Sequence, residues 1–157
     1  MKLNTGLSAK NTQAVASRLG KLLADEFVVF TKTKKAHWNV EGGDFQPMHE
    51  YFEKLFRELD TFIDTVAERI RSIGHFPPAS LKEMLDLTRL NEKHEGGTTS
   101  KDFIRTLLAD HENIITSIRK NIDECSNTYK DEGTAGMLSE LLEKHEKMVW
   151  MLSAHLS

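Results

Sequence analysis

The feature that most constrains the fold is a long amphipathic stretch that begins at Asp44 and ends near Arg71. After Pro47, which the first turn of a helix tolerates, no glycine or proline interrupts it until Gly74. Asp44 is of a residue type that commonly caps helix N-termini. Apolar residues recur along the stretch at three- and four-residue steps, which predicts one long helix with a core-facing stripe. These residues are Met48, Phe52, Leu55, Leu59, Phe62, Val66 and Ile70.

One flank of this stripe carries an imidazole and four carboxylates. On a helical wheel at about 100° per residue, these side chains gather beside the apolar face. They are His49, Glu53, Asp60, Asp64 and Glu68. Such a surface beside a core face is costly unless a positive charge sits there, so the pattern predicts a metal site. Asp60 is the exception, because we expect it to be solvated or paired with Arg57.

The spacing along this helix excludes a site built by one copy. Asp64 and Glu68 are one turn apart and can share an ion. Fifteen residues separate His49 from Asp64, which is about 22 Å at roughly 1.5 Å per residue, far more than the spacing of ligands around one metal. Two antiparallel copies, related by a two-fold axis near Phe56 and Arg57, bring His49 of one chain to Asp64 of the other. Such an interface makes two equivalent sites.

These residues resemble the ferroxidase signature of the Dps family (DNA-binding protein from starved cells, the mini-ferritins). The matching features are the string KAHWNVEGGDF, a second histidine twelve residues after the first, and D-x-x-x-E within DTVAERI. Further likeness in PASLKEM, LLADHENI, DEGTAG and EKHEKMVWML extends the resemblance over nearly the whole chain from about Lys10. The resemblance implies that His37 and His49 of one subunit bind metal together with Asp64 and Glu68 of its two-fold mate. That assignment agrees with the distances above.

Two further site residues follow from the resemblance. Glu53 matches a position where the family often has aspartate, which implies an additional ligand or a group beside the ligands. Trp38 is expected beside the metal as an electron donor, with a purely structural role as the alternative. Two imidazoles and two carboxylates without a thiolate suit Fe(II), with Zn or Mn as alternative occupants.

The rest of the chain predicts an all-α fold, a ferritin-like four-helix bundle with a short helix in the long connection between helices two and three. Ser80 followed by Glu83 is a capping-box pattern at the start of that short helix. We expect one domain over residues 1–157, with 1–11 as a flexible tail. The other helices are expected over 12–39, 44–73, 101–125 and 134–155, and the short helix over 81–87.

The remaining histidines carry no ligand pattern. His111 and His145 lie on or beside apolar stripes, so we interpret both as core or edge residues. The linkers and the C-terminus hold His75, His94 and His155. No histidine has a glutamate three residues before it, and the Glu-x-x-His motif of intrasubunit di-iron sites is therefore absent from the sequence.

Composition limits the partners and the compartment. With 157 residues and a net charge of −3, the chain does not have the basic character of a nucleic-acid binder, and its N-terminal tail offers only Lys2 and Lys10. The single cysteine, Cys125, fits a reducing compartment. No apolar segment has the length of a signal peptide or a membrane span. We expect a cytoplasmic protein without membrane attachment, with weak DNA binding and with nucleoid association left open.

The sequence therefore predicts a ferroxidase of the Dps type. The resemblance implies that it oxidises Fe(II), preferably with hydrogen peroxide rather than O2, and stores the ferric mineral in a hollow homododecamer. The alternatives are a DNA-binding protein that protects the nucleoid, and a metal-binding helical oligomer without redox turnover. By the same resemblance, Asp131 and Glu132 line three-fold pores, although Gly136 stands where many relatives carry an aspartate. Both acids could instead serve only as helix-start residues.

Overall fold

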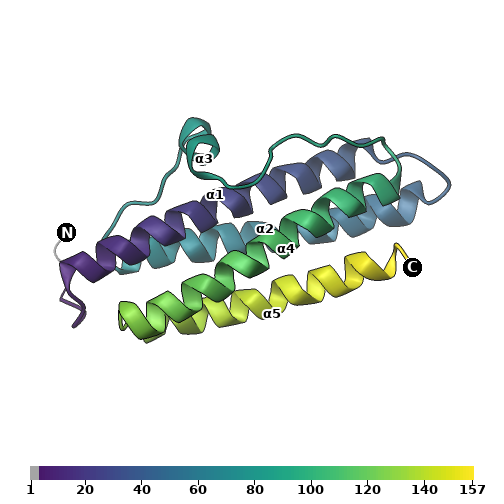
Figure 1. The fold of residues 1–157 in the computed structure, drawn as a ribbon. Coiled ribbons are helices and arrows are strands. Elements are labelled where there is room, and N and C mark those ends of the chain that lie inside the picture. Colours follow the sequence, from purple (N-terminus) through teal and green to yellow (C-terminus); the bar gives the residue numbers. More distant parts are fainter. Residues whose placement is uncertain (1–3) are drawn as a thin grey trace.

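The protein is a bundle of four long helices with a short helix packed on its outside (Figure 1). The computed structural model describes residues 4–157. Within this range there is no β-strand, so the predicted all-α, ferritin-like bundle is confirmed. None of the helices in the described range is long and apolar enough to span a membrane. The elements are α1 (Ala9–Asn39), α2 (Phe45–Ser72), α3 (Leu81–Leu87), α4 (Ser100–Asp123), the π-helical turn η1 (Glu124–Thr128) and α5 (Glu132–Ala154).

Helix α2 buries the stripe that its sequence predicts. The seven apolar residues named above are its seven buried residues, and each is at most 4% exposed. Burying a side chain of this size contributes roughly 1.5–3 kcal/mol, so this stripe is a main source of bundle stability. Asp44 occupies the N-cap position as predicted, but its side chain makes no capping hydrogen bond.

Helix α1 begins at Ala9, three residues before the predicted start. Ser8 provides the reason, since its hydroxyl accepts a hydrogen bond from the Asn11 backbone N–H at 3.1 Å. The Asn11 side chain then donates to the Tyr129 carbonyl at 2.9 Å. Residues 9–11 of the predicted tail are therefore helical, while Met1–Leu3 lie outside the described residues.

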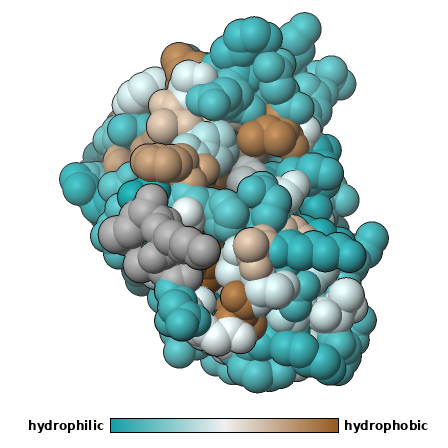
Figure 2. Space-filling view, turned by 90° about the vertical axis from the view of Figure 1, so that its left-hand side faces the viewer, coloured by the Kyte–Doolittle hydropathy of each residue, from teal (hydrophilic) through white to brown (hydrophobic). Residues whose placement is uncertain are grey.

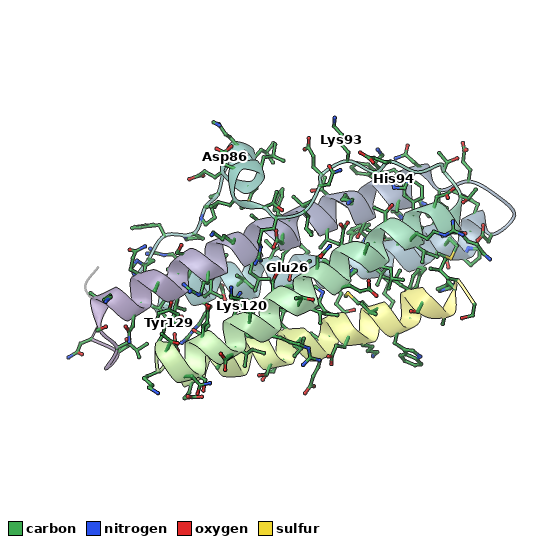
Figure 3. All side chains as sticks on the ribbon, viewed as in Figure 1. Glu26, Asp86, Lys93, His94, Lys120 and Tyr129 are labelled. Atoms are coloured by element: carbon green, nitrogen blue, oxygen red, sulfur yellow. The ribbon has the colours of Figure 1, made fainter. Side chains whose placement is uncertain are left out.

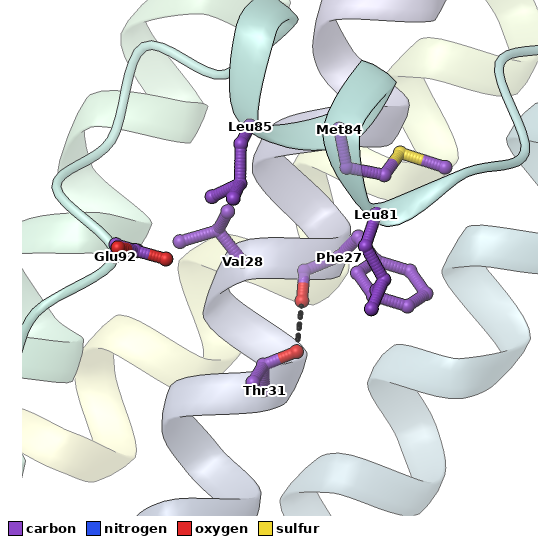
Figure 4. A pocket seen from close by; sticks show the side chains of 7 residues that line it. All are labelled: Phe27, Val28, Thr31, Leu81, Met84, Leu85 and Glu92. Carbon is purple, nitrogen blue, oxygen red and sulfur yellow. Dashed lines mark hydrogen bonds between the residues drawn. The ribbon is translucent and has the colours of Figure 1, made fainter.

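The long connection after α2 runs back along α1 and carries α3 (Figure 1). The predicted capping box is present: Ser80 Oγ accepts from the Glu83 N–H at 3.2 Å, and Glu83 Oε2 accepts from the Ser80 N–H at 3.0 Å. Buried Asp25 holds the connection beyond α3, because its carboxylate accepts from Thr88 and Arg89. A largely apolar cavity of about 250 Å³ lies between α1 and α3 (Figure 4). Its lining is Phe27, Val28, Thr31, Leu81, Met84, Leu85 and Glu92.

The turn from α4 to α5 differs from the prediction. Helix α4 ends at Asp123 and continues as η1 rather than as an α-helix to residue 125. The Tyr129 N–H bonds the Glu124 carbonyl at 3.0 Å, five residues back, which is the π-helical pattern. Asp131 then accepts from the Thr134 N–H, so α5 begins two residues before the predicted 134.

Three ionisable side chains from three helices form one hydrogen-bonded chain inside the bundle. Glu26 of α1 points into the interior (Figure 3), and its carboxylate accepts a hydrogen bond from His145 Nε2 of α5 at 2.8 Å. His145 Nδ1 lies 2.8 Å from His111 Nδ1 of α4. All three are fully buried, which confirms the two histidines as core residues. Burial, and then the neighbouring His145, lower the pKa of His111 well below its usual value, so His111 is neutral.

Candidate metal centre

The two predicted histidine ligands lie against each other at the junction of α1 and α2. Their rings stack with centroids 3.8 Å apart and an interplanar angle of 24°. His37 Nδ1 bonds the His49 carbonyl, and His49 Nδ1 bonds the His37 carbonyl, both at 2.8 Å. A carbonyl oxygen only accepts, so each Nδ1 carries the proton and donates it. In the neutral ring this leaves the Nε2 lone pair of both histidines free for a metal, and the carbonyls fix the ring orientations.

Aromatic side chains hold these two imidazoles in place. Phe56 packs edge-on against His37, and Phe45 packs against His49, each with ring centroids 5.3 Å apart. Neither contact was predicted from the sequence. A signal was available for one of them, because Phe45 precedes His49 by four residues in a helix and such pairs are surface neighbours.

Glu53 lies one turn after His49 and is ionised. Its carboxylate pairs with Arg57 at 2.5 Å. The hydrogen bond from Arg57 lowers the pKa of Glu53, and the charge of Arg57 acts in the same direction. The pair is solvent-exposed and therefore weak, so Glu53 can exchange Arg57 for a metal ion. Arg57 thus pairs with Glu53 rather than with Asp60, which is exposed.

Asp64 and Glu68 are exposed further along α2, and a single chain does not bring them to the histidines. From His49 to Asp64 the straight helix spans about 22 Å. Within residues 4–157 of one chain, no three His, Cys, Asp or Glu side chains converge so as to hold a metal ion. One chain therefore presents two separate candidate half-sites: the histidine pair with Glu53, and the Asp64–Glu68 pair.

Trp38 lies beside the histidines and is largely free of its own chain. Its side chain is 67% exposed. Together with Phe45 and Glu41 it lines an open hollow next to the histidine pair. The Lys34 ammonium lies 5.7 Å from the Trp38 ring and 4.8 Å from the Phe56 ring, which places a cation close to the candidate centre.

The two candidate pore acids have different surroundings at the end of the bundle where α5 begins, an end that is mostly hydrophilic (Figure 2). Asp131 is only 3% exposed, caps α5 and accepts from Arg69 Nη2 at 2.8 Å and from Thr134. Glu132 is exposed and accepts from Ser126 Oγ at 2.7 Å. Gly136 is exposed, and apart from its chain neighbours and its own helix backbone no atom lies within 4 Å of where its Cβ would stand.

Comparisons with known proteins identify the family. A family model described as a ferritin-like domain matches residues 16–157. The DNA protection during starvation protein of Helicobacter pylori is 37% identical over 142 residues, which cover 88% of this chain and 96% of that protein. An uncharacterized low temperature-induced protein of Nostoc is 35% identical over 151 residues, covering 96% of this chain and 84% of that one. The crystal structure of a Dps protein from Vibrio cholerae, described as belonging to a superfamily of ferritin-like diiron-carboxylate proteins, matches with a TM-score of 0.93 at 29% identity, covering 100% of this chain and 98% of that chain. This chain therefore belongs to the Dps family of ferritin-like proteins.

Proposed function

We propose that this protein is a ferroxidase that oxidises Fe(II) at sites shared between two copies and stores the ferric product inside a hollow homododecamer. The observation that carries the proposal is the crossed pair of hydrogen bonds between His37 and His49. It fixes both rings and leaves both Nε2 lone pairs free. A purely structural histidine pair has no need of two unprotonated nitrogens beside an ionised carboxylate.

The donor set suits iron as the substrate. Imidazole nitrogen binds Fe(II), and carboxylates favour the Fe(III) product because its higher charge is better neutralised by anionic oxygen. In the proposed dimer, His37, His49 and Glu53 of one chain combine with Asp64 and Glu68 of the other. Zn(II) and Mn(II) are alternative occupants of the same donors.

The surface around the histidines supports a second copy as the missing half. Ring contacts at 6.1 Å connect Phe27 to Phe30 and Phe30 to Phe56, and Phe56 contacts His37. This aromatic row leads from the α1–α3 cavity to the candidate centre. Leu81, which lines that cavity from α3, is 71% exposed. An apolar face of this kind next to an incomplete site favours an interface between copies of the chain.

Hydrogen peroxide is the oxidant we propose. It accepts two electrons, its O–O bond breaks, and two hydroxide ions form, while two Fe(II) ions each lose one electron to become Fe(III). Because peroxide takes both electrons at one site, no free hydroxyl radical is formed. In this proposal, Trp38, next to His37 in the chain, supplies an electron when only one Fe(II) is present. The single buried cysteine agrees with action in a reducing cytoplasm.

DNA protection is the second candidate, because several relatives carry that name. The net charge is −3 and the N-terminal tail has only Lys2 and Lys10 as cations, so few phosphates can be neutralised and we expect DNA binding to be weak at physiological salt. A gel shift of the assembled protein that persists at about 0.2 M salt would contradict this expectation, since retention at such salt requires several phosphate contacts.

The test of the proposed function is anaerobic loading with Fe(II), followed by separate additions of peroxide and O2. We expect fast formation of Fe(III), with peroxide reacting faster than O2. His37→Ala should lose the fast phase, because it removes a ligand. The control is His155→Ala, which removes an exposed histidine that packs on Tyr51, a residue on the other side of α2 from His49. Equal rates in wild type and His37→Ala would overturn the proposal.

A further inference from the structure

The short connection between α1 and α2 carries none of the proposed ligands, yet it determines how the two ligand histidines meet. His37 lies in the last turn of α1 and His49 near the start of α2, with Val40–Asp44 between the helices. Each histidine bonds the other's carbonyl at 2.8 Å, so a small shift of one helix along or around the other breaks both bonds. The register of this connection therefore sets the geometry of the half-site.

The connection is bound to the segment that precedes α4. The Glu41 N–H donates to the Thr98 carbonyl at 2.9 Å, and Thr98 Oγ1 donates to Glu41 Oε2 at 2.8 Å. Glu41 also forms an isolated parallel bridge with Thr99. The chain turns at Gly42, whose φ of +130° favours glycine. Hydrogen bonds of the Glu41 backbone and side chain thus fix the first half of the connection.

Its second half is fixed by a hydrogen bond that replaces a helix cap. Ser100 Oγ, in a residue only 7% exposed, donates to Asp44 Oδ2 at 2.5 Å. Asp44 is the N-cap residue of α2 but makes no side-chain bond to that helix. An aspartate cap typically stabilises a helix by about 1 kcal/mol. The Asp44 side chain does not make this capping bond, and through Ser100 it holds the start of α2 against α4 instead.

The start of α4 is a firm anchor for these bonds. Thr99 caps α4 by accepting from the Asp102 N–H. His94 stacks on Phe103 with centroids 4.4 Å apart and bonds Thr106 Oγ1 at 2.9 Å. A Cβ at Gly97 would stand 2.8 Å from Asp102 Oδ2, so a larger residue there would require the Asp102 side chain to move. The segment before α4 therefore has little freedom to move.

We propose that Ser100 and Asp44 are positioning residues for the metal centre, although neither contacts a ligand side chain. Their hydrogen bond fixes the first turn of α2 on α4, and this holds the His49 carbonyl and ring in register with His37. The inference rests on the proposed function, because it assumes that His37 and His49 bind metal. It assigns a role in that site to α4, a helix that supplies no ligand.

Cobalt(II) is the probe, because it reports the ligand field by its visible spectrum and does not turn over with O2. Titration of the assembled full-length protein gives the dissociation constant for each variant. For Ser100→Ala we expect roughly tenfold weaker binding, which corresponds to about 1.4 kcal/mol, because the lost hydrogen bond no longer holds the first turn of α2 in register. Asp44→Asn retains an acceptor oxygen and should bind within about twofold of wild type.

The double variant Asp44→Ala/Ser100→Ala separates a specific bond from general loosening. If the two residues act through their mutual bond, the double variant binds Co(II) as the Ser100→Ala variant does. If the loss of Co(II) affinity in the double variant instead equals the sum of the losses in Asp44→Ala and Ser100→Ala alone, the inference is overturned. Thr116→Ala is the matched control, because its exposed hydroxyl bonds only the Glu112 carbonyl of its own helix.

Failure of this inference is distinguishable from failure of the proposed function. Should wild type and His37→Ala bind Co(II) equally, the histidine pair is not a metal site and the proposed function fails. Should His37→Ala lose binding while Ser100→Ala retains full affinity and an unchanged Co(II) spectrum, the proposed function stands. In that case the positioning role is refuted.

Discussion

Replacing His145 by phenylalanine should destabilise the bundle severely, because it leaves a buried carboxylate without a partner. Glu26 is fully buried, its Oε2 already lacks a hydrogen bond, and its Oε1 is bonded by His145. Removing the partner of a buried charged group typically costs about 3–5 kcal/mol, because the charge is left uncompensated. For a chain of this length, each kcal/mol lowers Tm by about 2–4 °C, so the expected drop is roughly 6–20 °C.

Scanning calorimetry of the assembled protein measures this drop, and a second variant tests its cause. Glu26→Leu/His145→Phe removes the carboxylate as well and should recover most of the lost Tm, since apolar residues often replace a buried ionic pair at little cost. Glu26→Gln keeps an acceptor for His145 and should change Tm by only a few degrees. A double variant as unstable as His145→Phe alone would refute the argument from buried charge.

Three further predictions concern other parts of the molecule. Because burial keeps the pKa of His111 well below its usual value, the His111 imidazole takes up a proton below about pH 6.5 only in the unfolded chain. The free energy of unfolding should therefore fall by up to about 1.4 kcal/mol for each unit by which the pH is lowered, and the His111→Gln variant should show a smaller dependence on pH. Burial raises the pKa of the Cys125 thiol to about 11, so a thiol reagent at pH 8 should react only after denaturation, and rapid labelling of folded protein would contradict this. Glu132→Gln should slow mineral growth at low ionic strength, whereas an equal rate in an intact shell would limit Glu132 to a helix-start role.

Local periodicity predicted most of the fold. All seven apolar residues of the α2 stripe are buried, and the Ser80–Glu83 capping box opens α3 at the expected residue. Each of these two features depends on residues a few positions apart, for which helical geometry gives a direct rule. The π-helical turn after Asp123 was not predicted, because its backbone bonds leave no periodic signal in the side chains.

The candidate site was predictable only in part, and the reason is again separation along the chain. The resemblance to the Dps family implied that His37 and His49 face one site, and the structure brings them together. The Ser100–Asp44 bond and the Glu26–His145–His111 chain join residues from different helices, and no local rule pairs them. Glu26 did carry a signal, since a carboxylate on the apolar stripe of α1 requires a buried partner. For Asp131, the sequence left pore and cap as alternatives, and its bonds to Arg69 and Thr134 favour the cap.

Complementation between two inactive variants tests the shared site most directly. A dimer of one His37→Ala chain and one Asp64→Ala chain contains one site with both ligands lost and one site that is intact, if ligands come from different chains. Random association of equal amounts makes half of the dimers mixed, so about a quarter of the wild-type sites should oxidise Fe(II). Mixed dimers, verified by mass, that show no fast Fe(II) oxidation would contradict the shared site and place all ligands on one chain.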